Sequence, residues 1–218
     1  MQKLAKAKQM PFEWQDGRIP NDLGPKPSLK IRDLGLVVRL NRGRLVGSMS
    51  PWAWSATNGK PVFNFRSEGR DFAGSDRVLI LATGFYEHST PRKPGVKLMD
   101  RFFFTMRDQP WHWIAGIVKD GCFSILTTEP GPDIAPFHKR SVVPLAPTDG
   151  VEWLTLSKDE ADIFAPLPEN KPEVRVIRRD GIQLAADPAK PVPADEGGLL
   201  QGCDGRFGRV LVWTIFSA

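Results

Sequence analysis

The chain is organised around the stretch Val78-Leu79-Ile80-Leu81-Ala82-Thr83-Gly84-Phe85-Tyr86-Glu87-His88. Its first five residues are apolar, β-branched at two places and followed closely by a glycine, so they predict a buried strand. Glu87 comes directly after two aromatic residues at the end of that strand. Aromatic neighbours that exclude water raise the pKa of a carboxyl group, which can then exchange protons near neutral pH. On this stretch alone Glu87 has two readings, a proton-transfer group or an exposed residue at a strand end.

Length and composition describe a folded domain of ordinary kind. The 218 residues are enough for one sizeable core, or for one core with tails. Hydrophobic residues make up 41% and charged residues 25%, as in globular proteins, while 20 prolines indicate many loops and short strands. Lys and Arg outnumber Asp and Glu by 30 to 25, a net charge of +5. This balance favours a polyanionic partner but also fits a basic domain without one.

The cysteines and the N-terminus bear on metals, compartment and membranes. Cys122 and Cys203 belong to no Cys-x-x-Cys or Cys/His set, so we expect no metal and no cofactor, and a reducing compartment. No apolar run approaches the length of a membrane span. The lysines at positions 3, 6 and 8 are not followed by the apolar stretch of a signal peptide. We therefore expect a monomeric cytoplasmic protein, nucleoid-associated in a bacterium, with no membrane partner.

Short apolar or alternating segments predict many strands and few helices. After a helix that Pro11 ends and a loop over 16–35, a hairpin is predicted from 36–40 and 44–49. Further strands are predicted at 61–66, 78–86, 101–106, 111–118, 122–127 and 142–145, with a helical turn at 134–137 and a helix over 151–164. This order predicts an α+β fold, mainly antiparallel, with a compact barrel-like core and a few short helices.

One domain followed by a tail is expected. Residues 1–164 form the predicted domain and contain no internal repeat. Residues 165–218 are Pro-rich and polar, which is typical of a partly ordered tail. The last apolar segment, 210–216, fits either an edge strand or an extension without a role, and the sequence leaves both readings open.

Five polar residues stand within apolar sequence and are candidates for a site. In an extended strand Asn64 and Arg66 share one face. Glu87 lies at a strand end, and His138 and Arg140 come just before the next predicted strand. A single histidine in such a place is commonly a structural hydrogen-bonding residue, so only the combination points to a functional site.

In combination these residues resemble the SOS response-associated peptidase (SRAP) family, whose members shield abasic sites in single-stranded DNA. The order, spacing and residue types agree in five segments within residues 36–156, and the resemblance implies a compact α+β domain around a β-barrel-like core. The matching segments are Val62-Phe63-Asn64-Phe65-Arg66-Ser67-Glu68, Gly84-Phe85-Tyr86-Glu87, Trp113-Ile114-Ala115-Gly116-Ile117, Leu126-Thr127-Thr128-Glu129-Pro130 and His138-Lys139-Arg140-Ser141-Val142-Val143-Pro144-Leu145.

The resemblance implies roles for three residues in chemistry on an abasic sugar. Asn64 would orient the reacting groups by hydrogen bonding. Glu87 would act as acid and base in ring opening, and in self-cleavage of a leader peptide. His138 would carry a proton to or from the sugar.

The resemblance also implies a partner, single-stranded DNA with abasic sites. Arg66 and Arg140 would bind the flanking phosphates through two parallel hydrogen bonds each. Trp52 and Trp54 would stack on exposed bases, although core burial explains two tryptophans equally well.

One group of the family chemistry is absent from the printed sequence. In the family, a cysteine that becomes N-terminal after methionine removal attacks the sugar aldehyde, and its amine and thiol close a thiazolidine. Here Gln2 follows Met1, and neither Cys122 nor Cys203 supplies both groups. We therefore expect either a start upstream that carries Met-Cys, or a lyase-like or binding-only activity.

Three functions stay open at this point. The first is a SRAP-type protein acting on abasic sites, and the second is a non-catalytic domain that binds single-stranded nucleic acid. The third is a β-domain without a nucleic-acid role, which the basic balance and the strand with Asn64 and Arg66 disfavour.

Overall fold

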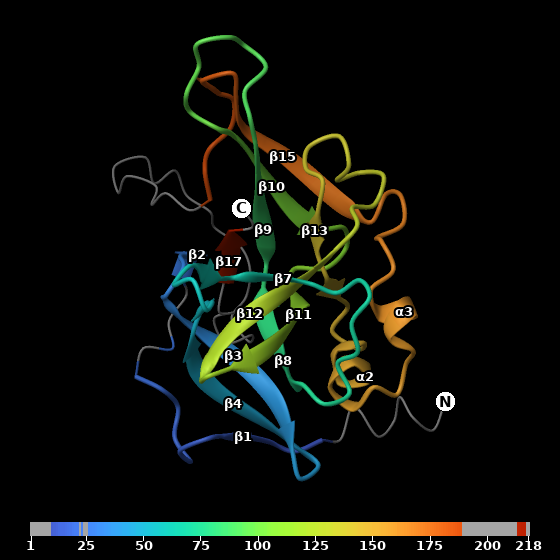
Figure 1. The fold of residues 1–218 in the computed structure, drawn as a ribbon. Helices are drawn as coiled ribbons and strands as arrows, with labels where there is room; N and C mark the ends of the chain where they lie inside the picture. Colours follow the sequence, from blue (N-terminus) through green and yellow to red (C-terminus); the bar gives the residue numbers. More distant parts are fainter. Residues whose placement is uncertain (1–9, 22, 24–25, 189–212, 217–218) are drawn as a thin grey trace, which may run out of the picture.

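The computed structural model describes residues 10–21, 23, 26–188 and 213–216, which form two open β-sheets and a small strand pair (Figure 1). The first sheet contains β1 (Phe12–Trp14), β3 (Leu34–Asn41), β4 (Arg44–Pro51), β7 (Asn64–Arg66), β8 (Asp76–Ala82), β11 (His112–Lys119), β12 (Cys122–Thr128), β13 (Ser141–Val142) and β14 (Pro144–Leu145). Its order is β1-β4-β3-β8-β11-β12-β13, with β14 paired to β11 and β7 paired to β12. The hairpin predicted around residues 41–43 is the antiparallel pair of β3 and β4.

The second sheet lies above the first in Figure 1. It contains β2 (Lys26–Leu29), β9 (Gly84–Ser89), β10 (Asp100–Met106), β15 (Pro172–Arg179), β16 (Ile182–Gln183) and β17 (Trp213–Phe216). Its order is β16-β15-β10-β9-β17-β2. The separate pair is formed by β5 (Trp54–Ser55) and β6 (Pro61–Val62).

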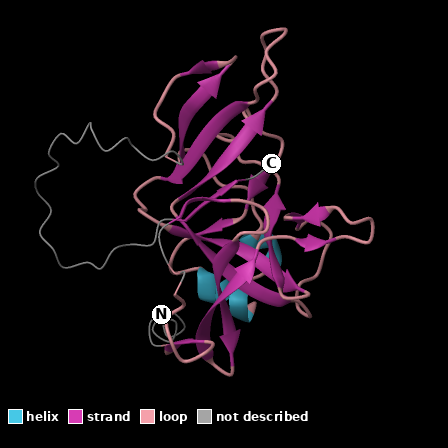
Figure 2. Ribbon diagram, turned by 90° about the vertical axis from the view of Figure 1, so that its left-hand side faces the viewer, coloured by secondary structure: helices cyan, strands magenta, loops and turns pink. Residues whose placement is uncertain are grey.

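Helix is limited to short segments in the described chain, as Figure 2 shows. They are α2 (Gly150–Thr155) and α3 (Glu160–Ile163), where the sequence predicted a single helix over 151–164. The helix breaks because Leu156 adopts a left-handed backbone with φ of 49°. α2 is fixed to the first sheet by the Trp153 indole, which is buried and donates to the Val78 carbonyl oxygen at 3.0 Å.

The predicted strand over 78–86 is two strands that pass from one sheet into the other. β8 lies between β3 and β11 in the first sheet, and β9 lies between β10 and β17 in the second. Only Thr83 separates them. A Cβ at Gly84 would lie 2.5 Å from the Phe104 carbonyl oxygen and would overlap the Phe103 ring. The crossing therefore requires glycine, since any side chain would push β10 away.

The prediction of a mainly antiparallel α+β fold with a few short helices is confirmed, but the barrel-like core is wrong. In the described residues β1 and β13 lie at opposite ends of the first sheet's strand order and do not pair with each other. Because β8 continues into β9, the chain extends into a second sheet instead of turning back to close the first.

Part of the predicted tail belongs to the second sheet. β15 pairs antiparallel with β10 along its length, and Ile177 of β15 is fully buried. The prediction of a tail from residue 165 is therefore corrected for 172–187. Its residues 189–212 lie outside the described part of the chain.

The two ends of the chain also bear on earlier expectations. β17 pairs with β9 on one side and β2 on the other, so the apolar C-terminal segment forms an inner strand and not an edge. β2 lies within the loop predicted over 16–35. The predicted N-terminal helix falls mostly on residues 1–9, outside the described residues.

Replacing Gly84 with alanine is expected to lower the free energy of unfolding by about 1–3 kcal/mol, because it overfills a closely packed contact. Urea unfolding at neutral pH measures the change. Gly74→Ala is the matched control, since a Cβ there meets no heavy atom within 4 Å, and it should stay within about 0.5 kcal/mol of the parent. Equal losses in both variants would remove the steric argument for Gly84.

Candidate functional site

The site begins with a carboxylate inside the second sheet. Side chains alternate along β9, so Phe85 and Glu87 share one face. Their cross-strand partners on β10 are Phe104 and Phe102, and the Phe85 and Phe104 rings stack at 5.4 Å. Glu87 is fully buried on this aromatic face. The reading of Glu87 as an exposed residue is therefore wrong.

His138 is the partner of this carboxylate. Its Nδ1 lies 2.9 Å from Glu87 Oε2 and 2.9 Å from the Arg140 carbonyl oxygen. Both of these atoms accept hydrogen bonds, so Nδ1 carries the hydrogen and Nε2 is left for other proton exchange. The turn before His138 positions the ring, because the His138 amide donates to the Ile134 carbonyl oxygen at 3.0 Å.

Neighbouring aromatic rings close the site on one side. Phe137, next to His138 in the chain, packs against Phe102 at 4.8 Å and against Phe104 at 5.7 Å between ring centroids. Phe102 is also the cross-strand partner of Glu87. The pair of Glu87 and His138 therefore lies beside a cluster of phenylalanine rings.

The contact with Glu87 raises the pKa of His138 above its ordinary value of 6.5, and desolvation opposes this shift only in part. The protonated imidazole therefore persists to higher pH than in a free histidine. The arrangement is a carboxylate and an imidazolium in contact, which can remove one proton and supply another.

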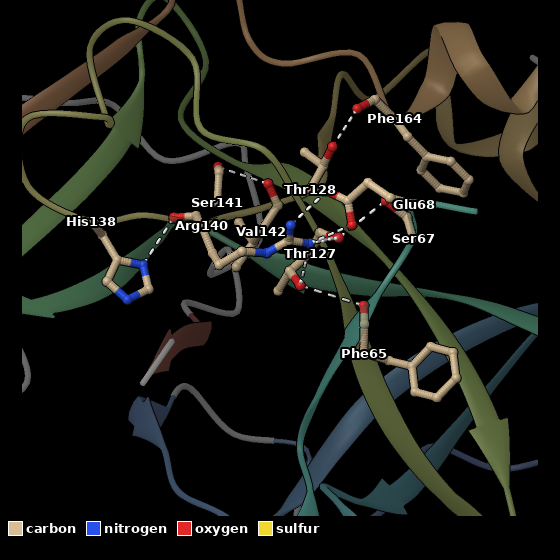
Figure 3. A network of polar contacts seen from close by, with 10 residues as sticks. All are labelled: Phe65, Ser67, Glu68, Thr127, Thr128, His138, Arg140, Ser141, Val142 and Phe164. Atoms are coloured by element: carbon tan, nitrogen blue, oxygen red, sulfur yellow. Dashed lines mark hydrogen bonds and ion pairs between the residues drawn. The ribbon is translucent and has the colours of Figure 1, made fainter. Parts of the chain in front are cut away.

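Arg140 lies in a second network, shown in Figure 3. Its guanidinium donates to both carboxylate oxygens of Glu68 at 2.6 and 2.8 Å. It also donates to the Thr127 carbonyl oxygen at 2.6 Å. The hydrogen bond from Arg140 holds the pKa of the Glu68 carboxyl below its ordinary value of 4.5. In this structure the paired N–H donors of the Arg140 guanidinium are therefore bound to a carboxylate.

The same network fixes three strands around Thr127. Thr127 of β12 pairs with Arg66 of β7 on one edge and with Val142 of β13 on the other. Ser67, directly after β7, donates through its hydroxyl to the Thr127 carbonyl oxygen at 3.0 Å. Since His138 comes shortly before β13, the network also anchors the segment that carries it.

Asn64 and Arg66 both lie on β7, as the alternation predicted. Asn64 is half-buried opposite Ile125 in the parallel pairing of β7 with β12. Arg66 is exposed, and its positive charge contributes to the low pKa of the Glu68 carboxyl. Arg66 is thus accessible, while Arg140 is enclosed.

Trp52 and Trp54 lie in the core, which corrects their predicted stacking on bases. Trp52 is completely buried, and its ring stacks on Phe123 with centroids 6.3 Å apart. Its indole donates to the Phe63 carbonyl oxygen at 2.9 Å. Trp54 is 6% exposed and packs on Phe65. Neither ring offers a free face to a base, so the alternative of core burial holds.

The sequence reading missed two contributors to this region. Glu68 lies two residues after Arg66, and this spacing is the sequence signal for a charge cluster. His112, the first residue of β11, is fully buried at 6.4 Å from the Phe85 ring. Burial lowers the pKa of His112 to about 4, so this histidine is neutral at physiological pH.

The described residues hold no group of three His, Cys, Asp or Glu side chains placed to bind a metal ion. Within the same part of the chain, no helix has the length and apolar character needed to cross a membrane.

Comparison with known proteins identifies the family. Residues 44–180, more than half of the chain, match the family described as SOS response associated peptidase (SRAP). This chain belongs to the SRAP family. Membership points to a function related to the DNA-damage response, and to an interaction with DNA. A search of curated proteins gave no match.

Solved structures support the SRAP-like fold. A Bordetella bronchiseptica protein aligns with a TM-score of 0.55 at 19% identity, over 69% of this chain and 86% of its own. A Bacteroides thetaiotaomicron protein gives 0.53 at 19%, over 73% and 79%. A phage-related protein of B. bronchiseptica gives 0.53 at 17%, over 72% and 86%. At these identities the likeness is one of fold.

Replacing Glu87 with glutamine is expected to lower the pKa of His138, because the charged partner is lost while desolvation remains. NMR titration of the His138 ring measures this pKa in parent and variant. In the parent, the stabilising contact is fully present below pH 6.5 and is lost as pH rises through the raised pKa of His138. A pKa of His138 that is unchanged in Glu87→Gln would contradict the assigned pairing.

Proposed function

We propose that this SRAP protein acts on abasic sites in single-stranded DNA, with Glu87 and His138 as its proton-transfer groups. The observation that carries the proposal is the 2.9 Å contact between a fully buried carboxylate and a histidine of raised pKa. A buried carboxylate in contact with a histidine whose pKa is raised is typical of sites for acid–base chemistry. We propose further that the protein is a monomer and acts in the cytoplasm, at the bacterial nucleoid.

The chemistry proposed begins with opening of the abasic sugar. The Glu87 carboxylate takes the proton of the C1′ hydroxyl, the C1′–O4′ bond breaks, and the protonated His138 supplies a proton to O4′. The product is an aldehyde and a C4′ hydroxyl. A base then removes a C2′ proton, a C2′–C3′ double bond forms, and the 3′ phosphate leaves. Asn64 orients the sugar in this scheme.

Strand incision tests the proposal. The protein is incubated with a labelled single strand that carries one abasic site, and with the same strand in a duplex. We expect faster incision of the single strand, and a roughly 10²- to 10⁴-fold loss of rate in Glu87→Gln, the usual size of an acid–base contribution. Glu169→Gln, at an exposed carboxylate before β15, is the control and should match the parent.

The same experiment separates the alternative function. A non-catalytic binder of single-stranded nucleic acid would bind the oligonucleotide without incising it, and Glu87→Gln would bind equally well. Failure of the parent to bind single-stranded DNA at all would reject both functions.

The two arginines predicted to bind phosphate are expected to behave differently. Arg66→Gln should weaken binding to single-stranded DNA and reduce the slope of log K against log salt by about 0.7, the value for one contact to a single strand. Its stability should not change, because Arg66 is exposed.

Arg140→Ala should instead lower the free energy of unfolding by about 1.5–3 kcal/mol, because it leaves Glu68 and the Thr127 carbonyl without their charged donor. Urea unfolding and salt-dependent binding measure the two effects. If Arg140→Ala were as stable as the parent, Arg140 would not be needed for the fold, and it would again be a candidate phosphate ligand.

A further inference from the structure

Arg179, the last residue of β15, reaches over the aromatic side of the candidate site. Its guanidinium carbon lies 5.5 Å from the centroid of Phe102 and 5.9 Å from that of Phe137. Phe102 is the cross-strand partner of Glu87, and Phe137 precedes His138. The guanidinium therefore lies on the same face of the second sheet as Glu87, beside the phenylalanine rings that neighbour Glu87 and His138.

This cation differs from the arginines around it. Arg101 is bound to Asp187 at 2.7 Å, Arg107 to Glu173 at 2.8 Å, and Arg178 to the Met99 carbonyl oxygen at 2.6 Å. Within the described chain no carboxylate lies within ion-pair distance of Arg179, and its contacts are the two rings. It is half-buried, so its charge is partly removed from water without an anion beside it.

Contact with ring faces leaves the donors of a guanidinium unused. A guanidinium over a ring interacts through its flat face, while its N–H groups point outward in the plane of the group. Those N–H groups match two oxygens of a phosphate. The two phenylalanines thus position the Arg179 side chain but accept no hydrogen bonds from its N–H groups.

The hairpin that carries Arg179 is held in place. Asp180 accepts from the backbone amides of Arg92 and Lys93 at 2.7 and 2.8 Å, and its own amide donates to Asp100 at 2.7 Å. Binding by Arg179 therefore does not require this turn to become ordered first.

We propose that Arg179 binds a backbone phosphate of the DNA strand that occupies the site, an inference that rests on the proposed function. Arg66 lies on β7 of the first sheet and Arg179 on β15 of the second. The two cations would bind the strand from the two sheets, with the pair of Glu87 and His138 supplied by the second sheet and the turn before β13. Arg140, already bound to Glu68, takes no part.

The test determines which individual phosphate, if any, the Arg179 side chain contacts. A single strand with one abasic analogue is made in versions that each carry one neutral methylphosphonate, and binding is measured for the parent and for Arg179→Gln. We expect Arg179→Gln to weaken binding about tenfold at low salt, and equally for a matched strand without the abasic analogue. One methylphosphonate should weaken the parent but leave Arg179→Gln unaffected.

Two variants complete the test. Arg175→Gln is the control, since Arg175 is exposed on the same strand and pairs with Phe103, on the opposite face from Glu87. It should bind like the parent. Arg179→Lys keeps the positive charge but lacks the paired N–H donors of a guanidinium, so it should bind with intermediate affinity. Thermal unfolding verifies that every variant is folded.

The outcomes separate this inference from the function it rests on. If the parent binds the abasic strand and no methylphosphonate is coupled to Arg179, the phosphate contact is rejected and the proposed function stands. An equal loss in Arg175→Gln would reduce the effect to general charge and would also reject the contact. If the parent does not bind single-stranded DNA, the proposed function itself fails.

Discussion

A carboxylate placed inside an aromatic core needs a partner, and this requirement links the two halves of the structure. Burial without compensation costs an ionised group several kcal/mol. Glu87 is fully buried, and His138 supplies an N–H at 2.9 Å. Glu87 comes from a central strand of the second sheet, while His138 comes from the turn that leads into β13 of the first. The contact thus joins the sheets at the place where the proposed chemistry occurs.

The network of Arg140, Glu68 and Thr127 supports this contact from the other side. Arg140 follows His138 by two residues, and its carbonyl oxygen accepts from the same Nδ1 that faces Glu87. Its side chain is held on Glu68 and Thr127. One residue therefore orients the histidine through its backbone and fixes the strand through its side chain. The two arginines predicted to bind phosphate therefore lie in different surroundings, since Arg66 is exposed and Arg140 is bound to Glu68.

Local features of the fold were predictable from the sequence, whereas the division of the strands into two open sheets was not. The β3–β4 hairpin follows from its turn residues, and the β8 strand from its apolar run. The two sheets do not, because whether β8 turns back or continues depends on how Phe103 fits against Gly84, a contact between distant residues. The strand over 172–179 is not evident from the sequence, because its surroundings are Pro-rich and its pairing partner β10 is distant in the chain. In the site, Glu87 and His138 were identifiable from residue type and order. The burial of Trp52 and the pairing of Arg140 depend on neighbours that the local sequence does not reveal.

The missing side chain at Gly84 also determines which way Glu87 faces. Successive residues of a strand point to opposite faces, so a slip of β9 by one position against β10 would exchange the faces of Tyr86 and Glu87. Tyr86 would then lie on the face of Phe102, and Glu87 on the buried face where Tyr86 now packs on Phe103. The Phe103 ring and the Phe104 carbonyl occupy the space next to Gly84 that any other residue would fill, and only this alignment places the glycine there. Gly84 thus fixes the register of β9. Through that register it also places an ionisable group, three residues further along the chain, among phenylalanine rings.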